Sequence, residues 1–317
     1  MSQSSFRYIY GPVASRRLGR SLGVDLVPFK VCSYDCIYCQ LGRTTNLTTE
    51  LGEYLPVDAM LIELSEKLKE EPPPDFIGLA GSGEPTLHSR IGELISGIKG
   101  LTSIPVAVLT NGSLLWKPEV QAGLAEADLV MPSLDAGCRT TFGRVSRPHP
   151  DISFQRMVDG LLTFSHGFKG EIWLEVFLLA GITDRREEVE RIAAIASSMR
   201  LSRVQLNTVA RPPAESSALT VSRDELEKLR ELFPRPCEVI AESRARPQGS
   251  SSEVANAEEK IVALLSRRPC TVEGIATGLG LHPNEVLKHL DVLCTKGIIR
   301  SDRRGPAVFY EEARSRP

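Results

Sequence analysis

Between about residue 22 and residue 240, apolar residues follow two alternating patterns that predict strands and helices in turn. Short continuous apolar runs predict buried strands near 22–27, 75–80, 104–110, 128–134, 171–179 and 203–209. Between these runs apolar residues recur at spacings of three and four, as in Leu61, Leu64 and Leu68, which is the period of an amphipathic helix. Such helices are expected near 57–70, 88–100, 117–126, 153–165, 185–199 and 222–232. Strands that alternate with helices pair in parallel through right-handed crossovers.

The pattern changes near residue 242. Residues 243–254 are rich in Ser, Gly and Pro and are expected to form a linker. Residues 255–317 then contain three helical stretches and two short β-type runs around a basic Gly-Pro turn. Three helices followed by a hairpin resemble a winged-helix domain. The chain is therefore divided into a core domain at 1–242, the linker, and a small winged-helix-like domain at 255–317.

Composition limits the classes of protein that this chain can belong to. A length of 317 residues allows one large α/β domain and a small second one. The net charge of −2 does not suggest strong nucleic-acid binding. No apolar run is long enough to span a membrane, and the polar N-terminus does not resemble a secretory signal. We therefore expect a cytoplasmic protein without membrane contact.

Three of the seven cysteines lie close together, at Cys32, Cys36 and Cys39, in a C-x3-C-x2-C pattern after the first predicted strand. Three thiolates at this spacing can ligate three irons of a cubane cluster and leave the fourth iron open to another ligand. A structural zinc site is one alternative, with His88 as a candidate fourth ligand. A disulfide and a chance grouping of buried cysteines are the others, and the scattered remaining cysteines suit a reducing compartment.

Polar residues also follow the later predicted strands. In a parallel barrel the working side chains lie at the C-terminal ends of the strands, so these groups are expected to share one cavity. They are Gly81-Ser82-Gly83-Glu84, Asn111, Ser133 with Asp135, Glu175 and Asn207-Thr208. Helix capping is an equally good interpretation of Asn111 and Ser133. An ion pair between Glu175 and Arg211 is an alternative to a role for Glu175 in the cavity.

The cysteine motif, with Tyr38 just before its third cysteine, resembles the radical S-adenosylmethionine (SAM) superfamily, and Gly81-Ser-Gly-Glu84 resembles a Gly-rich element of the same family. The resemblance implies an α/β fold with a partial TIM-like (β/α)6 barrel. It also implies that Cys32, Cys36 and Cys39 hold a [4Fe–4S] cluster and that SAM chelates the fourth iron.

Further site residues follow from the same resemblance. Tyr38 is expected to pack against the adenine of SAM, and the Gly-rich element to line its methionine part, with the Glu84 carboxylate available to an ammonium group. The full set of expected SAM contacts is Tyr38, Gly81, Ser82, Gly83, Glu84, Asn111, Ser133, Asp135 and Glu175. Arg147, in a long loop from Ala136 to Asp151, and Arg211 are candidates to contact substrate or SAM. No catalytic residue for the substrate reaction is assigned.

The resemblance implies an enzyme that receives an electron from a donor such as flavodoxin or ferredoxin. It would cleave SAM to a 5′-deoxyadenosyl radical, which abstracts hydrogen from an unknown substrate. The segment from Tyr10 to Val24, followed by the cysteine loop and the Gly-rich element through Leu87, resembles a branch grouped with wyosine-type tRNA-modifying enzymes, so tRNA-base modification is an alternative. A second alternative is an iron–sulfur-dependent transcriptional regulator. The domain at 255–317 is expected to contact nucleic acid, a protein or itself.

Overall fold

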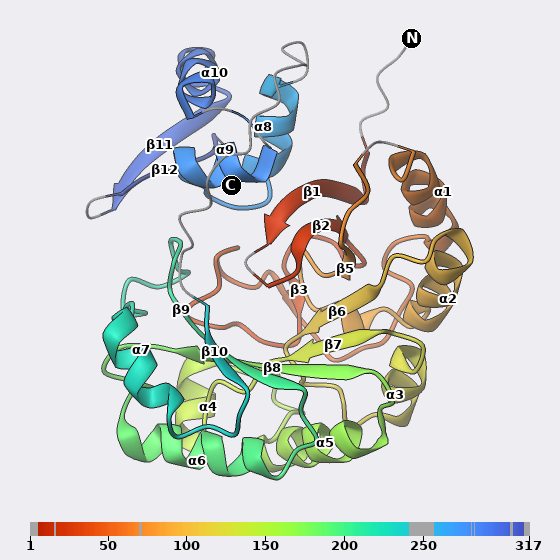
Figure 1. Cartoon of the computed structure of the whole chain (residues 1–317), viewed down its shortest axis with the longest axis vertical. Coiled ribbons are helices and arrows are strands. Elements are labelled where there is room, and N and C mark those ends of the chain that lie inside the picture. The colour runs from red at the N-terminus through yellow and green to blue at the C-terminus, as the bar shows by residue number, and fades with distance from the viewer. Residues whose placement is uncertain are drawn as a thin grey trace.

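A single curved sheet carries the core of the protein (Figure 1). The computed structural model describes residues 6–15, 17–69, 72–240, 257–279, 281, 283–304 and 307–313. The eight strands of the sheet lie in the order β1 (Ile9–Ser15), β2 (Gly19–Val24), β5 (Phe76–Leu79), β6 (Val106–Thr110), β7 (Leu129–Pro132), β8 (Glu171–Leu178), β9 (Arg203–Thr208) and β10 (Cys237–Val239). The strands from β2 to β10 run in parallel, whereas β1 pairs with β2 in antiparallel orientation.

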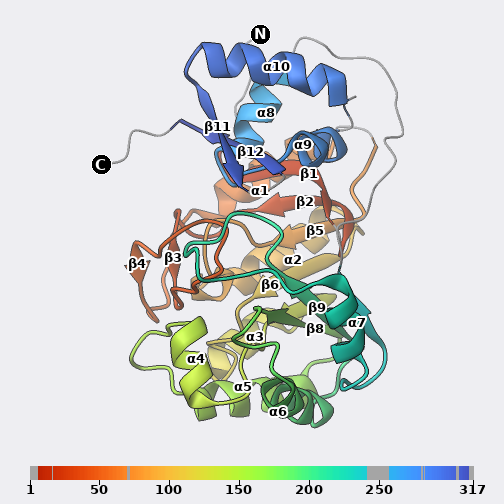
Figure 2. The same ribbon diagram turned by 90° about the vertical axis from the view of Figure 1, so that its left-hand side faces the viewer.

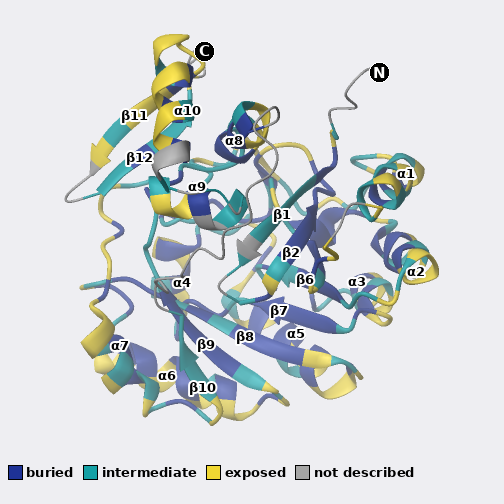
Figure 3. Cartoon of the chain, turned by 45° about the horizontal axis from the view of Figure 1, so that its top comes forward, coloured by how far each residue is buried: buried dark blue, intermediate teal, exposed yellow. Residues whose placement is uncertain are grey.

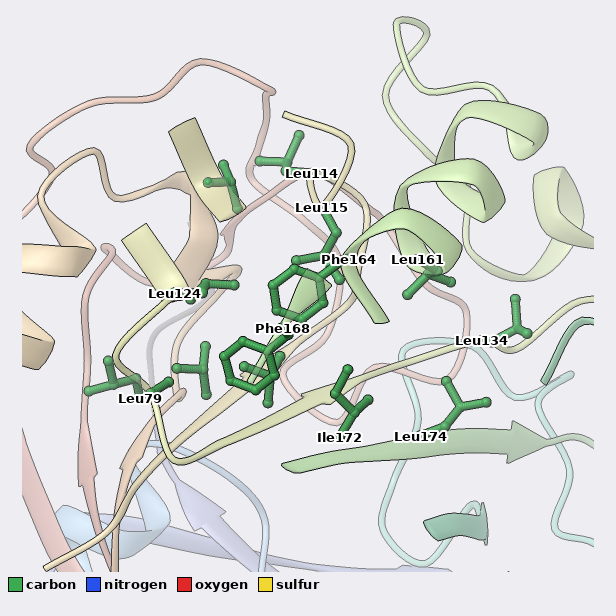
Figure 4. Close-up of a cluster of buried hydrophobic side chains, with 14 of the residues drawn as sticks. Leu79, Leu114, Leu115, Leu124, Leu134, Leu161, Phe164, Phe168, Ile172 and Leu174 are labelled. Atoms are coloured by element: carbon green, nitrogen blue, oxygen red, sulfur yellow. The ribbon is translucent and has the colours of Figure 1, made fainter. Parts of the chain in front are cut away.

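Helices cover the outer face of this sheet, as Figures 1 and 2 show. They are α1 (Val57–Lys67), α2 (Ile91–Leu101), α3 (Pro118–Leu124), α5 (Phe154–Gly167), α6 (Arg186–Ser197) and α7 (Arg223–Arg230). Their apolar sides pack on the strands, where Leu124, Leu161 and Phe164 lie with Ile172 and Leu79 in one core (Figure 4). The six predicted strands and six predicted helices are therefore present, and the α/β class with a parallel sheet is confirmed.

Besides the short elements near the cysteines and the Gly-rich segment, three elements of the core were not predicted. The strand β1 contains Gly11 and Pro12, and its pairing with β2 shifts register between Tyr10 and Val13, so its sequence does not resemble a regular strand. The helix α4 (Arg139–Val145) lies inside the segment that was expected to be a long loop. Its short length and the glycine at position 143 conceal its helical period. The third element is the three-residue edge strand β10.

Smaller elements surround the cysteines and the Gly-rich segment. A two-stranded parallel ladder joins β3 (Val31–Cys32) to β4 (Asn46–Leu47), and a short 3₁₀ helix, η1 (Pro85–Leu87), follows Glu84. Figure 3 shows that the strands of the main sheet are largely buried, whereas exposed residues lie on the outer sides of the helices. None of the described helices combines the length and the apolar character that a membrane span requires.

The C-terminal module, as we call residues 257–313, has its own hydrophobic cluster. It contains α8 (Ala257–Leu265), α9 (Val272–Leu279), α10 (Pro283–Thr295) and an antiparallel hairpin of β11 (Ile299–Arg304) and β12 (Ala307–Glu312). The module lies over β1, and Val13 of that strand packs against the module's cluster (Figures 1 and 2). The expected linker at 243–254 lies outside the described residues.

Candidate cluster and cofactor site

The three clustered cysteines lie on one loop that the surrounding backbone holds in place. The loop begins at the end of β3, and Cys39 N donates to Cys36 O at 3.2 Å. The amide of Ile37 donates to the carbonyl of Val145 at 3.0 Å, which ties the loop to the end of α4. All seven cysteines of the chain are free thiols, so the disulfide interpretation is wrong.

The surroundings of these thiols favour a positively charged ligand. Burial raises the pKa of Cys32 to about 12, with a further contribution from the nearby Glu84 carboxylate, and burial also raises the pKa of Cys36. Lys30 Nζ donates to Cys39 Sγ at 3.2 Å, and Asn111 Nδ2 donates to Cys32 Sγ at 3.6 Å. A bound metal deprotonates such thiols, and hydrogen bonds to sulfur tune an iron–sulfur cluster. The donor set therefore fits a [4Fe–4S] cluster.

His88, the candidate fourth ligand of a zinc site, is buried, and both of its ring nitrogens have other hydrogen-bond partners. Its Nε2 atom lies 2.7 Å from Leu55 O, and its Nδ1 atom accepts a hydrogen bond from Arg90 N at 3.2 Å. In the described part of the chain, no three His, Cys, Asp or Glu side chains converge on a single ion-sized position. A cubane cluster does not require such convergence, because each iron takes its own thiolate.

The Gly-rich segment packs directly against the cysteine loop, which explains its glycines. Lys30 N donates to Ser82 O at 2.7 Å, and Glu84 N donates to Val31 O at 3.1 Å. A Cβ atom on Gly83 would lie 1.9 Å from Val31 O, and Gly81 has a φ of +112°. Only glycine fits both positions, because the first is sterically closed and the second has a left-handed backbone.

Glu84 has a different role from the one expected for it. The residue is 2% exposed, and its Oε1 atom accepts hydrogen bonds from Thr86 N at 3.0 Å and from the Thr86 and Thr110 hydroxyls at 2.6 Å each. Its Oε2 atom accepts from Asn111 N at 2.7 Å. Because Glu84 is buried and does not line the cavity described below, the expectation that its carboxylate meets an ammonium group stays a prediction that this geometry does not support. Glu84 instead fixes two strand ends to each other.

Asn111 and Ser133 do not line the cavity described below. Asn111 Oδ1 accepts from Ser113 N at 2.9 Å, while its Nδ2 atom donates to Ser33 Oγ at 2.9 Å. Ser133 forms an isolated parallel bridge with Glu175 and is half-buried. The local-capping interpretation therefore describes Asn111 best, although its amide also contacts Cys32.

A cavity of about 360 Å³ lies at the C-terminal ends of the strands, beside the cysteine loop. Of the predicted site residues, the cavity lining includes Tyr38, Cys39, Gly81, Ser82, Glu175 and Arg211. Asn207 at the end of β9 also lines it, as the strand-end pattern predicts. The cavity thus brings the cysteine loop, the Gly-rich segment and the last strands together.

Tyr38 and Asp135 form one buried unit. The Tyr38 ring stacks on Phe177 with 4.3 Å between ring centroids, and its hydroxyl donates to the Asp135 carboxylate. Asp135 also accepts from Phe177 N at 2.9 Å, and burial raises its pKa to about 7. Asp135 does not line the cavity, so its expected contact with SAM stays a prediction that this geometry does not support.

Glu175 faces the cavity, but its partner is not the expected arginine. Glu175 Oε2 lies 2.7 Å from Arg17 Nη1, and its Oε1 atom accepts from Asn207 Nδ2 at 2.9 Å. Arg211 Nη1 instead donates to Gln40 Oε1 at 2.9 Å. The interpretation of a Glu175–Arg211 ion pair is therefore wrong.

Arg147 lies outside the cavity lining. Its Nη2 atom donates to Glu215 Oε2 at 2.9 Å, and Glu215 also binds Arg43, which lies 2.6 Å from Asp35. This chain of ion pairs fastens the turn after α4 to the cysteine loop. The candidate contact of Arg147 with substrate or SAM stays a prediction that this geometry does not support, because its guanidinium already pairs with Glu215.

Several cavity residues were not found from the sequence. Tyr10 and Arg17 belong to the N-terminal segment that carried the family resemblance, yet no role was assigned to them. Leu264, Arg267 and Arg268 come from the C-terminal module, for which no cavity residue was expected. The adjacent arginines directly after an apolar helix were the only local sign of a special role.

Comparisons with known proteins agree with this geometry. The family model described as Radical SAM superfamily matches residues 26–194. A protein named GTPase Obg from Brachyspira hyodysenteriae is 41% identical over 312 residues, which cover 98% of this chain but 46% of that protein. A UPF0026 protein from Helicobacter pylori strain J99 is 35% identical over 314 residues, covering 98% of this chain and 99% of the relative.

A solved structure supports the fold alone. The radical SAM methyltransferase from Sphaerobacter thermophilus superimposes with a TM-score of 0.54 at 15% identity, over 71% of this chain and 67% of that one. The family match covers more than half of the chain, and it includes the cysteine loop, the Gly-rich segment and four of the parallel strands. The chain therefore belongs to the radical SAM superfamily, whose enzymes use a [4Fe–4S] cluster together with S-adenosylmethionine.

Proposed function

We propose that this protein is a radical SAM enzyme in which Cys32, Cys36 and Cys39 hold the cluster. The observation that carries the proposal is the packing of the cysteine loop against the Gly-rich segment at the edge of one cavity. When bound, the cluster and SAM supply the reductive cleavage of SAM to methionine and a 5′-deoxyadenosyl radical, which takes a hydrogen atom from substrate.

The chain's own residues orient the cofactors and enclose them. Lys30 Nζ donates a hydrogen bond to Cys39 Sγ and so holds this sulfur in place, and hydrogen bonds to sulfur tune an iron–sulfur cluster. Gly81 and Ser82 line the cavity with a segment whose backbone a ligand can approach closely. Tyr38 stacks on Phe177, and its other face is the proposed support for the adenine ring. The hydrogen bonds of Glu84 hold these elements in register before any ligand binds.

Anaerobic reconstitution of the full chain tests this proposal. We expect about four irons and four sulfides per chain, and 5′-deoxyadenosine after addition of SAM and dithionite. Cys36→Ala should lose both, because one iron then lacks its protein ligand. Cys138→Ala is the matched control, since Cys138 is also a free thiol but lies outside the motif. A Cys36→Ala variant that retained full iron content and cleavage would refute the assignment.

We further propose that residues 1–242 and 255–317 are separate domains and that the second is winged-helix-like. The separate hydrophobic clusters and the order of three helices and a hairpin support this division. A cytoplasmic location with a flavodoxin or ferredoxin as reductant belongs to the same proposal. The finer assignment to wyosine-type tRNA modification rests on the segment from Tyr10 to Val24 together with the cysteine loop and the Gly-rich element.

One observation favours the enzyme over a transcriptional regulator. Residues 255–317 contain ten Lys and Arg against eight Asp and Glu, a surplus of two positive charges. Two of these ten, Arg267 and Arg268, line the cavity. The remaining eight Lys and Arg are balanced by the eight Asp and Glu, so an outer surface has little net positive charge with which to neutralise phosphates.

A further inference from the structure

The C-terminal module supplies one wall of the cavity that contains the candidate SAM site. Leu264, Arg267 and Arg268 line the same space as Cys39 and Gly81, although they lie far from both in the sequence. Figure 2 shows the module above β1 and β2, the strands that form this side of the cavity. The module is thus a part of the site.

Arg267 is fixed to the Gly-rich segment through Asp25. The Arg267 guanidinium pairs with Asp25 Oδ2 and lies 4.2 Å from the centroid of the Tyr10 ring. The other carboxylate oxygen, Asp25 Oδ1, accepts a hydrogen bond from Ser82 N at 2.8 Å. Asp25 is 6% exposed, so this charge requires its partner. Arg267 therefore positions the module, and its positive charge is neutralised by Asp25.

Arg268 differs from Arg267 because no carboxylate in the described part of the chain compensates its charge. Arg268 is half-buried and lines the cavity. Within the described residues, its guanidinium forms no hydrogen bond or ion pair. Arg17, another arginine of the cavity lining, pairs with Glu175. Of Arg17, Arg267 and Arg268, the last is therefore the lining arginine whose charge no described carboxylate offsets.

We propose that Arg268 binds an anionic group of the substrate, a phosphate or a carboxylate, inside this cavity. A guanidinium presents a planar fork that matches both groups, and partial burial strengthens the interaction relative to bulk water. Arg267 acts as a positioning residue that holds the module, and with it Arg268, against the Gly-rich segment. This inference rests on the proposed function, because it identifies the substrate class of that same cavity.

Titration calorimetry on the reconstituted full chain, with SAM at saturation, tests the inference. Inorganic pyrophosphate and succinate are titrated separately, and at least one of them is expected to bind. Arg268→Gln should weaken that binding about tenfold to a hundredfold, because a charge-assisted hydrogen bond is lost. Arg268→Lys should bind the anion with an affinity between those of the unaltered protein and Arg268→Gln, because lysine keeps the positive charge but lacks the planar guanidinium group. Arg303→Gln is the control, because Arg303 is exposed on β11 of the same module.

The two anions distinguish a phosphate-bearing from a carboxylate-bearing substrate. The inference is overturned if neither anion binds, or if Arg268→Gln binds as tightly as the unaltered protein. Iron content is measured on the same samples. A normal cluster without anion binding would refute this inference alone, whereas anion binding to protein that takes up no iron would refute only the proposed function.

Discussion

The cavity has two sides that are built in different ways. On the cluster side, defined as the cysteine loop and residues 81–84, buried polar groups are satisfied by near neighbours: Glu84 accepts from three residues at two strand ends. On the arginine side, defined as Arg17, Arg267 and Arg268, the charges come from both ends of the chain: Arg17 pairs with Glu175 and Arg267 pairs with Asp25, whereas Arg268 has no ion-pair partner among the described residues. The cluster side is thus set by the sheet itself, whereas the arginine side depends on docking of the C-terminal module.

Removal of the Glu84 carboxylate should have the largest effect. Glu84→Ala would leave the amides of Thr86 and Asn111 and the buried Thr110 hydroxyl without this acceptor. We expect a loss of about 4 kcal/mol in the free energy of unfolding, since each abandoned buried group costs about 1–3 kcal/mol. Urea unfolding measures it, with the exposed Glu126→Ala as control. A well-folded variant that had merely lost affinity for SAM would show that the carboxylate serves the ligand after all.

Asp135 should make the cluster side sensitive to pH. Its pKa is raised from 3.8 to about 7 by burial, so the native state holds an extra proton between these values. The contribution of Asp135 to the free energy of unfolding should therefore be largest at low pH, and it should be lost as the pH rises through 7. From pH 5 to pH 8 the loss is roughly 2–3 kcal/mol, because one pKa unit corresponds to about 1.4 kcal/mol.

Asp135→Asn is the variant that isolates this effect. The amide can still accept from Phe177 N and donate to the Tyr38 oxygen, so the shape of the unit is retained. Thermal unfolding between pH 5 and pH 8 should show a flatter profile than that of the unaltered protein. Identical slopes for the two proteins would mean that Asp135 does not titrate in this range.

On the arginine side, loss of Arg267 should have a smaller effect. Arg267→Gln would leave Asp25 as a buried and uncompensated charge, for which we expect about 2 kcal/mol of lost stability after allowance for the 22% exposure of the arginine side chain. The double variant with Asp25→Asn should recover part of this loss. A double-mutant cycle in urea measures the coupling. Additive effects would indicate that the module docks without this pair.

The sequence predicted the local parts of this molecule and missed the distant ones. The strands and helices follow apolar periods, and the cysteine loop and Gly-rich segment are visible as short motifs, so these were found. The inward orientation of Glu84 was not, because a motif does not show which way a side chain turns. The partners of Arg147 and Glu175 lie in other segments, at Glu215 and Arg17, which a linear pattern cannot reveal.

The arginine side was missed for a further reason. Residues 255–317 have their own apolar clusters and follow a linker-like segment, so the sequence indicated a domain apart from the site. In the structure, the same module packs on β1, a strand that its Gly-Pro pair concealed. One wall of the cavity was therefore missed for two reasons. The strand β1 does not have a strand-like sequence, and the module has the sequence pattern of an independent domain.

The ion pair between Asp25 and Arg267 also has a consequence for the timing of assembly, because its partners are 242 positions apart. Synthesis proceeds from the N-terminus, so the cysteine loop and the Gly-rich segment leave the ribosome long before the module exists. During that interval the cavity lacks its last wall, and the thiols of the loop are accessible to iron–sulfur delivery. Docking of the module then completes the enclosure, and we expect late docking to make cluster insertion easier in the nascent chain than in the finished protein.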